Sequence, residues 1–276
     1  MPMTMDPIHI HIISDSTGET GILVARASLA QFEGIEVREH IWSMTRSDAQ
    51  VDDVLKHIAA NRGFVMFTLV EGKLRDALEM GCRKLQVPCI SILDPIIAAL
   101  GAYLGAEIKA QPGRQHVMDA EYFSRIEAMQ FVLAHDDGQS TWNIDQADVL
   151  IVGVSRTSKT PTCIYLANRG IKAATIPFVP GCPMPQEILE AKNPLIVGLT
   201  KDPKRLVQIR RNRLLMLDQD QETDYVDLES VSKEVNEALR LFNSHKWPVI
   251  DVTRRSIEET AATIMQMHQR RKEGAA

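Results

Sequence analysis

The chain alternates short runs of apolar, β-branched residues with longer stretches of helical period, and this alternation limits the folds it can adopt. The first run, residues 8–14 (Ile-His-Ile-His-Ile-Ile-Ser), has the two-residue period of a strand. In the first half of the chain we expect further strands at 36–42, 63–69 and 88–93, and helices at 20–32, 48–60 and 74–85. Strands separated by helices of this length imply a parallel sheet covered on both faces, so the expected fold class is α/β.

The alternation breaks over residues 101–140, where glycine and proline surround one short amphipathic stretch at 119–129. It then resumes, with strands expected at 149–153, 173–178, 195–199 and 248–252, and helices at 159–169, 185–191, 203–215, 227–243 and 256–271. We therefore predict an N-terminal doubly wound parallel-sheet domain at 1–110, a connecting segment at 111–145, and a C-terminal α/β domain at 146–276.

Composition indicates which kinds of partner and which cellular compartment to expect for this chain. The formal net charge of -5 provides no global basic field, so we expect no nucleic-acid partner. No apolar stretch is long enough to span a bilayer, and the first residues lack the features of a secretory signal. The four cysteines form no Cys-x-x-Cys pair, which favours reduced thiols in a cytoplasmic protein over a zinc site.

The strongest local motif is the segment from Gly153 to Thr160, Gly-Val-Ser-Arg-Thr-Ser-Lys-Thr. It matches the phosphate-binding pattern G-x-x-x-x-G-K-[ST], except that Ser158 stands where the second glycine belongs. An apolar strand leads into this loop and a helix leads out of it, so backbone N–H groups and the helix N-terminus favour an anion. The alternative interpretation is a polar turn with a helix cap, and Ser158 is a weakness because glycine reaches backbone angles that serine adopts only at a cost.

Each part of the motif has an expected role. Lys159 can reach the phosphate that is transferred, and we expect it to face solvent when no nucleotide is bound. The hydroxyl of Thr160 is a candidate Mg²⁺ ligand. The residues expected to bind nucleotide are Gly153, Val154, Ser155, Arg156, Thr157, Ser158, Lys159 and Thr160. With this loop, the C-terminal domain at 146–276 is expected to be a P-loop kinase-like α/β domain.

Two further candidates for catalysis lie outside the loop. Asp137, in the sequence His-Asp-Asp-Gly, is a carboxylate that could orient a hydroxyl or bind metal, although such a turn needs no function. Residues 201–213 form the most basic stretch, and its helical spacing predicts Leu206, Ile209 and Leu214 in the core, with Arg210, Arg211 and Arg213 outside it. Arg210 is the candidate for contacting the transferred phosphate, and a solvated basic face is the alternative.

Two strand ends complete the candidates. Asp251 follows an expected strand and lies either at the ligand-binding edge of the sheet or at the cap of the next helix. Residues 14–18, Ser-Asp-Ser-Thr-Gly, form a second strand-to-helix turn, which is either an anion site or a helix cap.

The segment GVSRTSKTPTCIYLANRGIKAATIPFVPG, together with SDSTGETG near the start and HDDG before the loop, resembles the pyruvate, phosphate dikinase regulatory protein family. That family includes the phosphoenolpyruvate synthase regulatory proteins, and the resemblance covers essentially the whole chain. The synthase branch tends to carry Cys-Gly where this chain has Thr157-Ser158, which favours the dikinase branch.

The resemblance implies a bifunctional enzyme. Such an enzyme transfers the β-phosphate of ADP to a threonine of the dikinase, and removes it again with inorganic phosphate, releasing pyrophosphate. ADP, inferred Mg²⁺, inorganic phosphate and the dikinase are therefore the expected cofactors and partners, with a homodimer left open. The alternatives are phosphoenolpyruvate synthase as the target, an ATP-dependent small-molecule P-loop kinase, or a non-catalytic nucleotide-sensing regulator.

Overall fold

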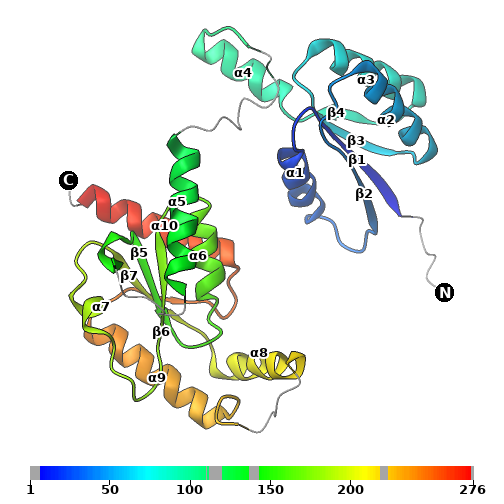
Figure 1. Cartoon of the computed structure of the whole chain (residues 1–276). Helices are drawn as coiled ribbons and strands as arrows, with labels where there is room; N and C mark the ends of the chain where they lie inside the picture. The colour runs from blue at the N-terminus through cyan, green and yellow to red at the C-terminus, as the bar shows by residue number, and fades with distance from the viewer. Residues whose placement is uncertain (1–6, 110, 112–119, 137–142, 218–222, 275–276) are drawn as a thin grey trace, which may run out of the picture. The chain divides into compact units, whose positions relative to one another are not determined.

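The computed structural model describes residues 7–109, 111, 120–136, 143–217 and 223–274. The chain divides into two compact units, unit 1 at Met1–Val117 and unit 2 at Met118–Ala276. Their elements are labelled along the chain in Figure 1. Each unit is built on its own parallel sheet and is described by itself.

Unit 1 contains a four-stranded sheet in the order β2-β1-β3-β4, with every pairing parallel. Its strands are β1 (Ile8–Ser14), β2 (Val37–Trp42), β3 (Gly63–Thr68) and β4 (Cys89–Ser91), and its helices are α1 (Glu19–Leu29), α2 (Asp48–Ala60), α3 (Gly72–Leu85) and α4 (Asp94–Leu104). Successive residues of β1 serve opposite faces, because Ile12 packs with Ala25 of α1 while Ile13 packs with Val54 and Leu78 of α2 and α3. The expected doubly wound α/β arrangement is confirmed.

Helix α4 was not among the expected elements. Its sequence is apolar nearly throughout after Asp94-Pro95, and none of its residues is buried. An apolar run without a polar face has no 3.6-residue alternation, and Gly101 inside it suggested a loop. The helix nevertheless forms, with proline in its first turn and Gly105 at its C-cap in the left-handed region (φ 60°).

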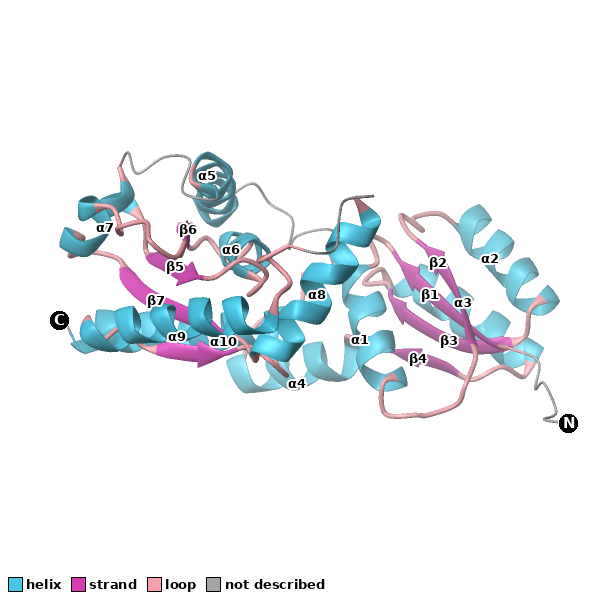
Figure 2. Ribbon diagram, turned by 90° about the horizontal axis from the view of Figure 1, so that it is seen from below, coloured by secondary structure: helices cyan, strands magenta, loops and turns pink. Residues whose placement is uncertain are grey.

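Unit 2 contains a second four-stranded parallel sheet, in the order β6-β5-β7-β8. The strands of both sheets can be followed in Figure 2. The strands of unit 2 are β5 (Val149–Gly153), β6 (Ala173–Pro177), β7 (Leu195–Thr200) and β8 (Val249–Asp251). Its helices are α5 (Ala120–Ala134), the short 3₁₀ helix η3 (Ile144–Gln146), α6 (Lys159–Ala167), α7 (Gln186–Glu190), α8 (Pro203–Met216), α9 (Leu228–Ser244) and α10 (Ile257–Gly274).

Helices cover both faces of this sheet because its strands are apolar on both sides. Ile151 packs in a cluster with residues of α5, α6 and α10, whereas its neighbour Leu150 packs in a cluster with residues of α7, α8 and α9. Helix α5 lies within the range 111–145 and contributes Ala128 and Val132 to the first of these clusters. It therefore belongs to the core of unit 2.

The strand order positions the candidate site. In unit 2, β5 lies between β6 and β7, and the chain leaves its carboxyl end into α6. In open parallel sheets, ligands bind outside the carboxyl ends of the strands where the winding reverses direction. The loop after Gly153 occupies this place in unit 2, and the turn after Ser14 occupies the corresponding place in unit 1.

Candidate functional site

The loop begins at Gly153, the last residue of β5, where the backbone is crowded. A Cβ atom at this position would lie 2.8 Å from the carbonyl oxygen of Leu199 on β7 and 2.9 Å from Oγ1 of Thr157. Since the first of these atoms is backbone in a neighbouring strand, any side chain would push the two central strands apart. Glycine is therefore required at this position.

Two residues of the loop, Arg156 and Ser158, adopt left-handed backbone angles, with φ of 71° and 65°. Ser158 is the N-cap of α6, and its side chain makes no capping hydrogen bond. The position where the general pattern carries glycine is thus a position whose conformation favours glycine. A non-glycine residue in this region costs roughly 1–2 kcal/mol, which Ser158 incurs without a compensating cap.

Ser158→Gly should therefore leave nucleotide binding intact and change the free energy of unfolding by less than about 1 kcal/mol. Relief of the left-handed strain is offset by the greater backbone freedom that glycine has in the unfolded chain. Calorimetric titration with ADP and chemical denaturation measure the two effects. Ser158→Ala is the matched control, because it keeps the strain and removes only the hydroxyl. Loss of ADP binding in both variants would contradict this account and assign a ligand contact to the hydroxyl.

Lys159 is buried, with a relative exposure of 6%. Its Nζ atom donates a hydrogen bond to the carbonyl oxygen of Val154 at 3.1 Å, and Oγ1 of the buried Thr157 donates to the same oxygen at 2.9 Å. The expectation of a solvent-facing lysine was wrong, because the side chain folds back from the first residue of α6 into the loop. The loop therefore encloses the ammonium group of Lys159.

The loop lines a cavity of about 320 Å³. Residues from β5, α6 and α8 or their adjoining loops surround it, and the described ones include no acidic side chain: Ser155, Arg156, Ser158, Lys159, Thr160, Pro161, Lys201 and Ile209. Three cationic side chains on one concave surface, at the N-terminus of a helix, favour an anion such as a phosphate.

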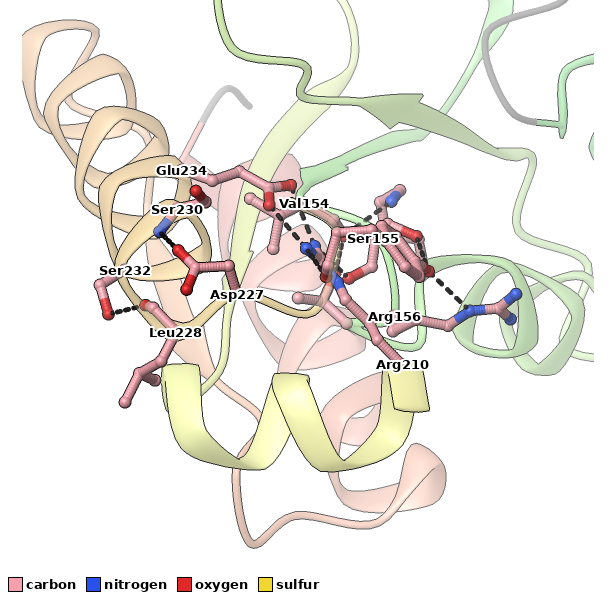
Figure 3. Close-up of polar contacts among 12 residues, drawn as sticks. Val154, Ser155, Arg156, Arg210, Asp227, Leu228, Ser230, Ser232 and Glu234 are labelled. Carbon is pink, nitrogen blue, oxygen red and sulfur yellow. Dashed lines mark hydrogen bonds and ion pairs between the residues drawn. The ribbon is translucent and has the colours of Figure 1, made fainter. Parts of the chain in front are cut away.

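Arg210 lies in the core, with a relative exposure of 1%. Its guanidinium makes a bidentate ion pair with Glu234 of α9, at 2.8 and 3.0 Å, and donates to the carbonyl oxygen of Ser155 at 3.1 Å (Figure 3). It also lies over the ring of Tyr225, 4.5 Å from the centroid. Arg210 therefore links α8 and α9 to the backbone of the phosphate loop.

The prediction that Arg210 leaves the core was wrong. Burial of this charge is compensated by a carboxylate on another helix, a contact that helical spacing within α8 cannot indicate. Val207 is buried on α8 together with Leu206 and Leu214, whereas Ile209, expected in the core, is only half-buried. Arg211 and Arg213 are exposed, as expected. A direct contact of Arg210 with the transferred phosphate stays a prediction.

Tyr225 adds a second connection to the loop. Its hydroxyl lies 3.1 Å from Oγ of Ser155 and accepts a hydrogen bond from Nε of Arg156 at 3.4 Å. Ser155 is thus held through its side chain by Tyr225 and through its carbonyl by Arg210. No sequence pattern pointed to Tyr225, since it lies 70 residues from Ser155 along the chain.

Thr160 contacts Asp136, a carboxylate of the His-Asp-Asp-Gly sequence that was not the predicted catalytic residue. Oγ1 of Thr160 donates to Oδ1 of Asp136 at 2.9 Å, and Oγ1 of Thr175 on β6 donates to the same atom at 2.9 Å. Asp137, the residue chosen from the sequence, lies outside the described residues, so its catalytic role stays a prediction. Its neighbour Asp136 is the described carboxylate that contacts the loop.

A Mg²⁺ ion would find suitable donors here. Mg²⁺ takes one or two protein oxygens and completes its shell with water and substrate phosphates. The hydroxyl of Thr160 and the carboxylate of Asp136 are donors of this kind. Among the described residues no group of three or more His, Cys, Asp or Glu could hold a metal, so an ion at this site would depend on the phosphates of a ligand.

The other two candidate turns have structural hydrogen bonds. Asp251 accepts from the backbone N–H of Thr253 at 2.8 Å, and Ser256 and Glu259 form the capping pair of α10, so the capping role considered for Asp251 was wrong. In unit 1, the N-cap of α1 is Gly18, which provides no side-chain cap. Asp15 accepts from the N–H of Val70 at 2.8 Å and joins the ends of β1 and β3.

None of the helices that the structure describes combines the length and the apolar character needed to cross a bilayer.

Comparison with known proteins assigns the chain to a family. The model of the kinase/pyrophosphorylase family matches residues 10–265. A protein of Paramagnetospirillum magneticum is 56% identical over 266 residues, covering 96% of this chain and 86% of the relative. One of Sphingopyxis alaskensis is 54% identical over 263 residues, covering 95% of this chain and 97% of the relative. Both carry the provisional name pyruvate, phosphate dikinase regulatory protein. The chain belongs to the kinase/pyrophosphorylase family.

Proposed function

We propose that the chain is an ADP-dependent protein kinase and phosphate-dependent pyrophosphorylase that acts on a threonine of pyruvate, phosphate dikinase. In the forward reaction the threonine oxygen attacks the β-phosphorus of ADP, the bond to the bridging oxygen breaks, and AMP leaves. In the reverse reaction an oxygen of inorganic phosphate attacks the phosphothreonine, and the products are pyrophosphate and the free hydroxyl. The observation that carries the proposal is the loop Gly153–Thr160, closed around Lys159, in a chain of this family.

Each part of the loop has a role in the proposed reaction. The backbone of residues 153–158 would hold the phosphates, and the ammonium of Lys159 would neutralise the phosphoryl group that moves. Mg²⁺, when bound, would neutralise charge on the phosphates, and Thr160 with Asp136 are the residues that would hold it. Arg210 and Tyr225 hydrogen-bond to Ser155 and would help to hold the loop in position.

The proposed target protein is inferred from the names of the relatives. Proteins 51–56% identical to this chain over most of their length carry the name of a dikinase regulator, which supports the dikinase over phosphoenolpyruvate synthase. A small-molecule kinase would use the same loop with a metabolite as acceptor. A nucleotide sensor would bind ADP and transfer nothing.

Radioactive ADP labelled separately in its α- or β-phosphate distinguishes these functions. The purified protein is incubated with each form, with and without the dikinase and, in parallel, with phosphoenolpyruvate synthase. We expect the β-label alone to appear on the dikinase, as phosphothreonine, and to be released as pyrophosphate when unlabelled phosphate is added. Label on the synthase would show that the synthase is the target. Label on a small molecule would indicate a metabolite kinase, and binding without transfer would indicate a sensor.

A further inference from the structure

Lys201 is a buried cation at the carboxyl end of β7. Its relative exposure is 9%, and among the described residues its ammonium takes part in no ion pair or hydrogen bond. The buried Arg210, by contrast, has Glu234 as its counter-ion. Most of the side chain is buried, whereas the ammonium is not among the fully enclosed polar atoms of the described residues and so reaches solvent. An ammonium held at the protein interior without a counter-ion calls for an explanation.

The position of Lys201 supplies one. It lines the same cavity as Lys159 and Arg156, and the described lining contains no carboxylate. Lys159 follows β5 and Lys201 follows β7, and these strands are paired in register, with Gly153 opposite Leu199. The two ammonium groups therefore belong to neighbouring strand ends, at the edge of the sheet where ligands bind.

The acidic residues near Lys201 make no ion pair with it and have other hydrogen-bond partners. Asp202 caps α8 by accepting from the N–H of Arg205 at 3.0 Å, and Asp251 accepts from the N–H of Thr253 at 2.8 Å. Burial lowers the pKa of Lys201, the positive charge of Arg205 lowers it further, and Asp251 only opposes these effects. Lys201 therefore lacks an ion-pair partner among the described residues, and a bound anion in the cavity would supply one.

We propose that Lys201 is a second phosphate-binding residue, whose ammonium pairs with phosphate oxygens in the cavity that Lys159 also lines. The identity of the anion, ADP or inorganic phosphate, rests on the proposed function. Both proposed reactions place two phosphorus centres at the site together, the two phosphates of ADP or the phosphothreonine and inorganic phosphate. Lys159 and Arg156 line the same cavity, and Lys201 adds a further positive charge for the second phosphorus centre.

Lys201→Gln tests this proposal in the full-length protein. Loss of a charged hydrogen bond should weaken the binding of ADP and of inorganic phosphate by roughly 10- to 100-fold, measured by calorimetric titration of each. Thermal unfolding without ligand should show a midpoint equal to or higher than that of the wild type, because the ammonium makes no ion pair or hydrogen bond with the described residues that the variant would lose. Lys204→Gln, on the exposed first turn of α8, is the matched control and should bind both anions as the wild type does.

The changes in anion affinity and in the unfolding midpoint together distinguish a ligand-binding lysine from a structural one. Weaker anion binding with unchanged or greater stability supports the proposal, and recovery of binding in Lys201→Arg supports it further. Unchanged binding in Lys201→Gln, beside normal binding by the wild type, would overturn the role of Lys201 alone. A large loss of stability in the ligand-free variant would overturn it too, by assigning Lys201 to the fold. Failure of the wild type to bind either anion would instead overturn the proposed function, and the phosphate assignment with it.

Discussion

Replacing Lys159 by alanine should slow phosphate transfer to the target at least ~100-fold, because a positioned charge at a migrating phosphoryl group acts where water is largely excluded. The ammonium already lies within the loop, bonded to the carbonyl oxygen of Val154. The measurement is the initial rate of phosphothreonine formation at saturating ADP, together with the rate of pyrophosphate release in the reverse direction. Both should fall, since both reactions move a phosphoryl group through this site.

Because Lys159 is buried, alanine also removes packing atoms from the loop. Lys159→Met separates the two effects, since methionine fills much of the same space and carries no charge. We expect Lys159→Met to be as inactive as Lys159→Ala while unfolding closer to the wild type. Near-normal turnover in the methionine variant would contradict the assignment of Gly153–Thr160 as the phosphate loop.

ADP should support phosphorylation of the dikinase, and ATP freed of ADP should not. The loop, Lys159 and Thr160 must all contact the phosphate that is transferred. In ATP, one extra phosphate shifts the polyphosphate of the nucleotide by a whole P–O–P unit relative to these groups. A displacement of about 1 Å can already cost ~100-fold in rate, so a shift of this size should abolish transfer.

The donor test treats ATP with an ADP-consuming enzyme before the regulator and the dikinase are added. Phosphothreonine is then measured by mass spectrometry, and an untreated ADP reaction gives the reference signal. Strong phosphorylation by the treated ATP would refute the choice of ADP and favour an ordinary ATP-dependent kinase.

Periodicity was sufficient to predict most of the fold. The apolar run ending at Gly153 and the alternating run from Ile8 each form an interior strand of a parallel sheet, because buried β-branched residues have few other stable arrangements. Helix α4 was missed, since its apolar residues show no polar face and periodicity is then silent. Periodicity thus does not reveal a helix whose sides do not differ, although a short apolar run such as β5 is still recognised as a strand.

The candidate site was predictable only where its residues are contiguous. The loop from Gly153 to Thr160 forms one motif, and the left-handed angle of Ser158 explains why that position usually carries glycine. Contacts with Asp136 and Tyr225 depend on distant segments, and no spacing rule links them to the loop. The burial of Arg210 likewise depends on Glu234 of another helix.

The division into two units determines how the stability of any variant should be interpreted. Each unit buries its own apolar clusters, so cooperativity, the all-or-none loss of structure, is a property of a unit. Trp42 packs beside His57 in unit 1, whereas Trp247 packs beside Phe242 in unit 2. A spectroscopic signal averaged over the whole chain therefore reports on both units, and the effect of a substitution in the phosphate loop is best followed by a probe within unit 2, such as Trp247.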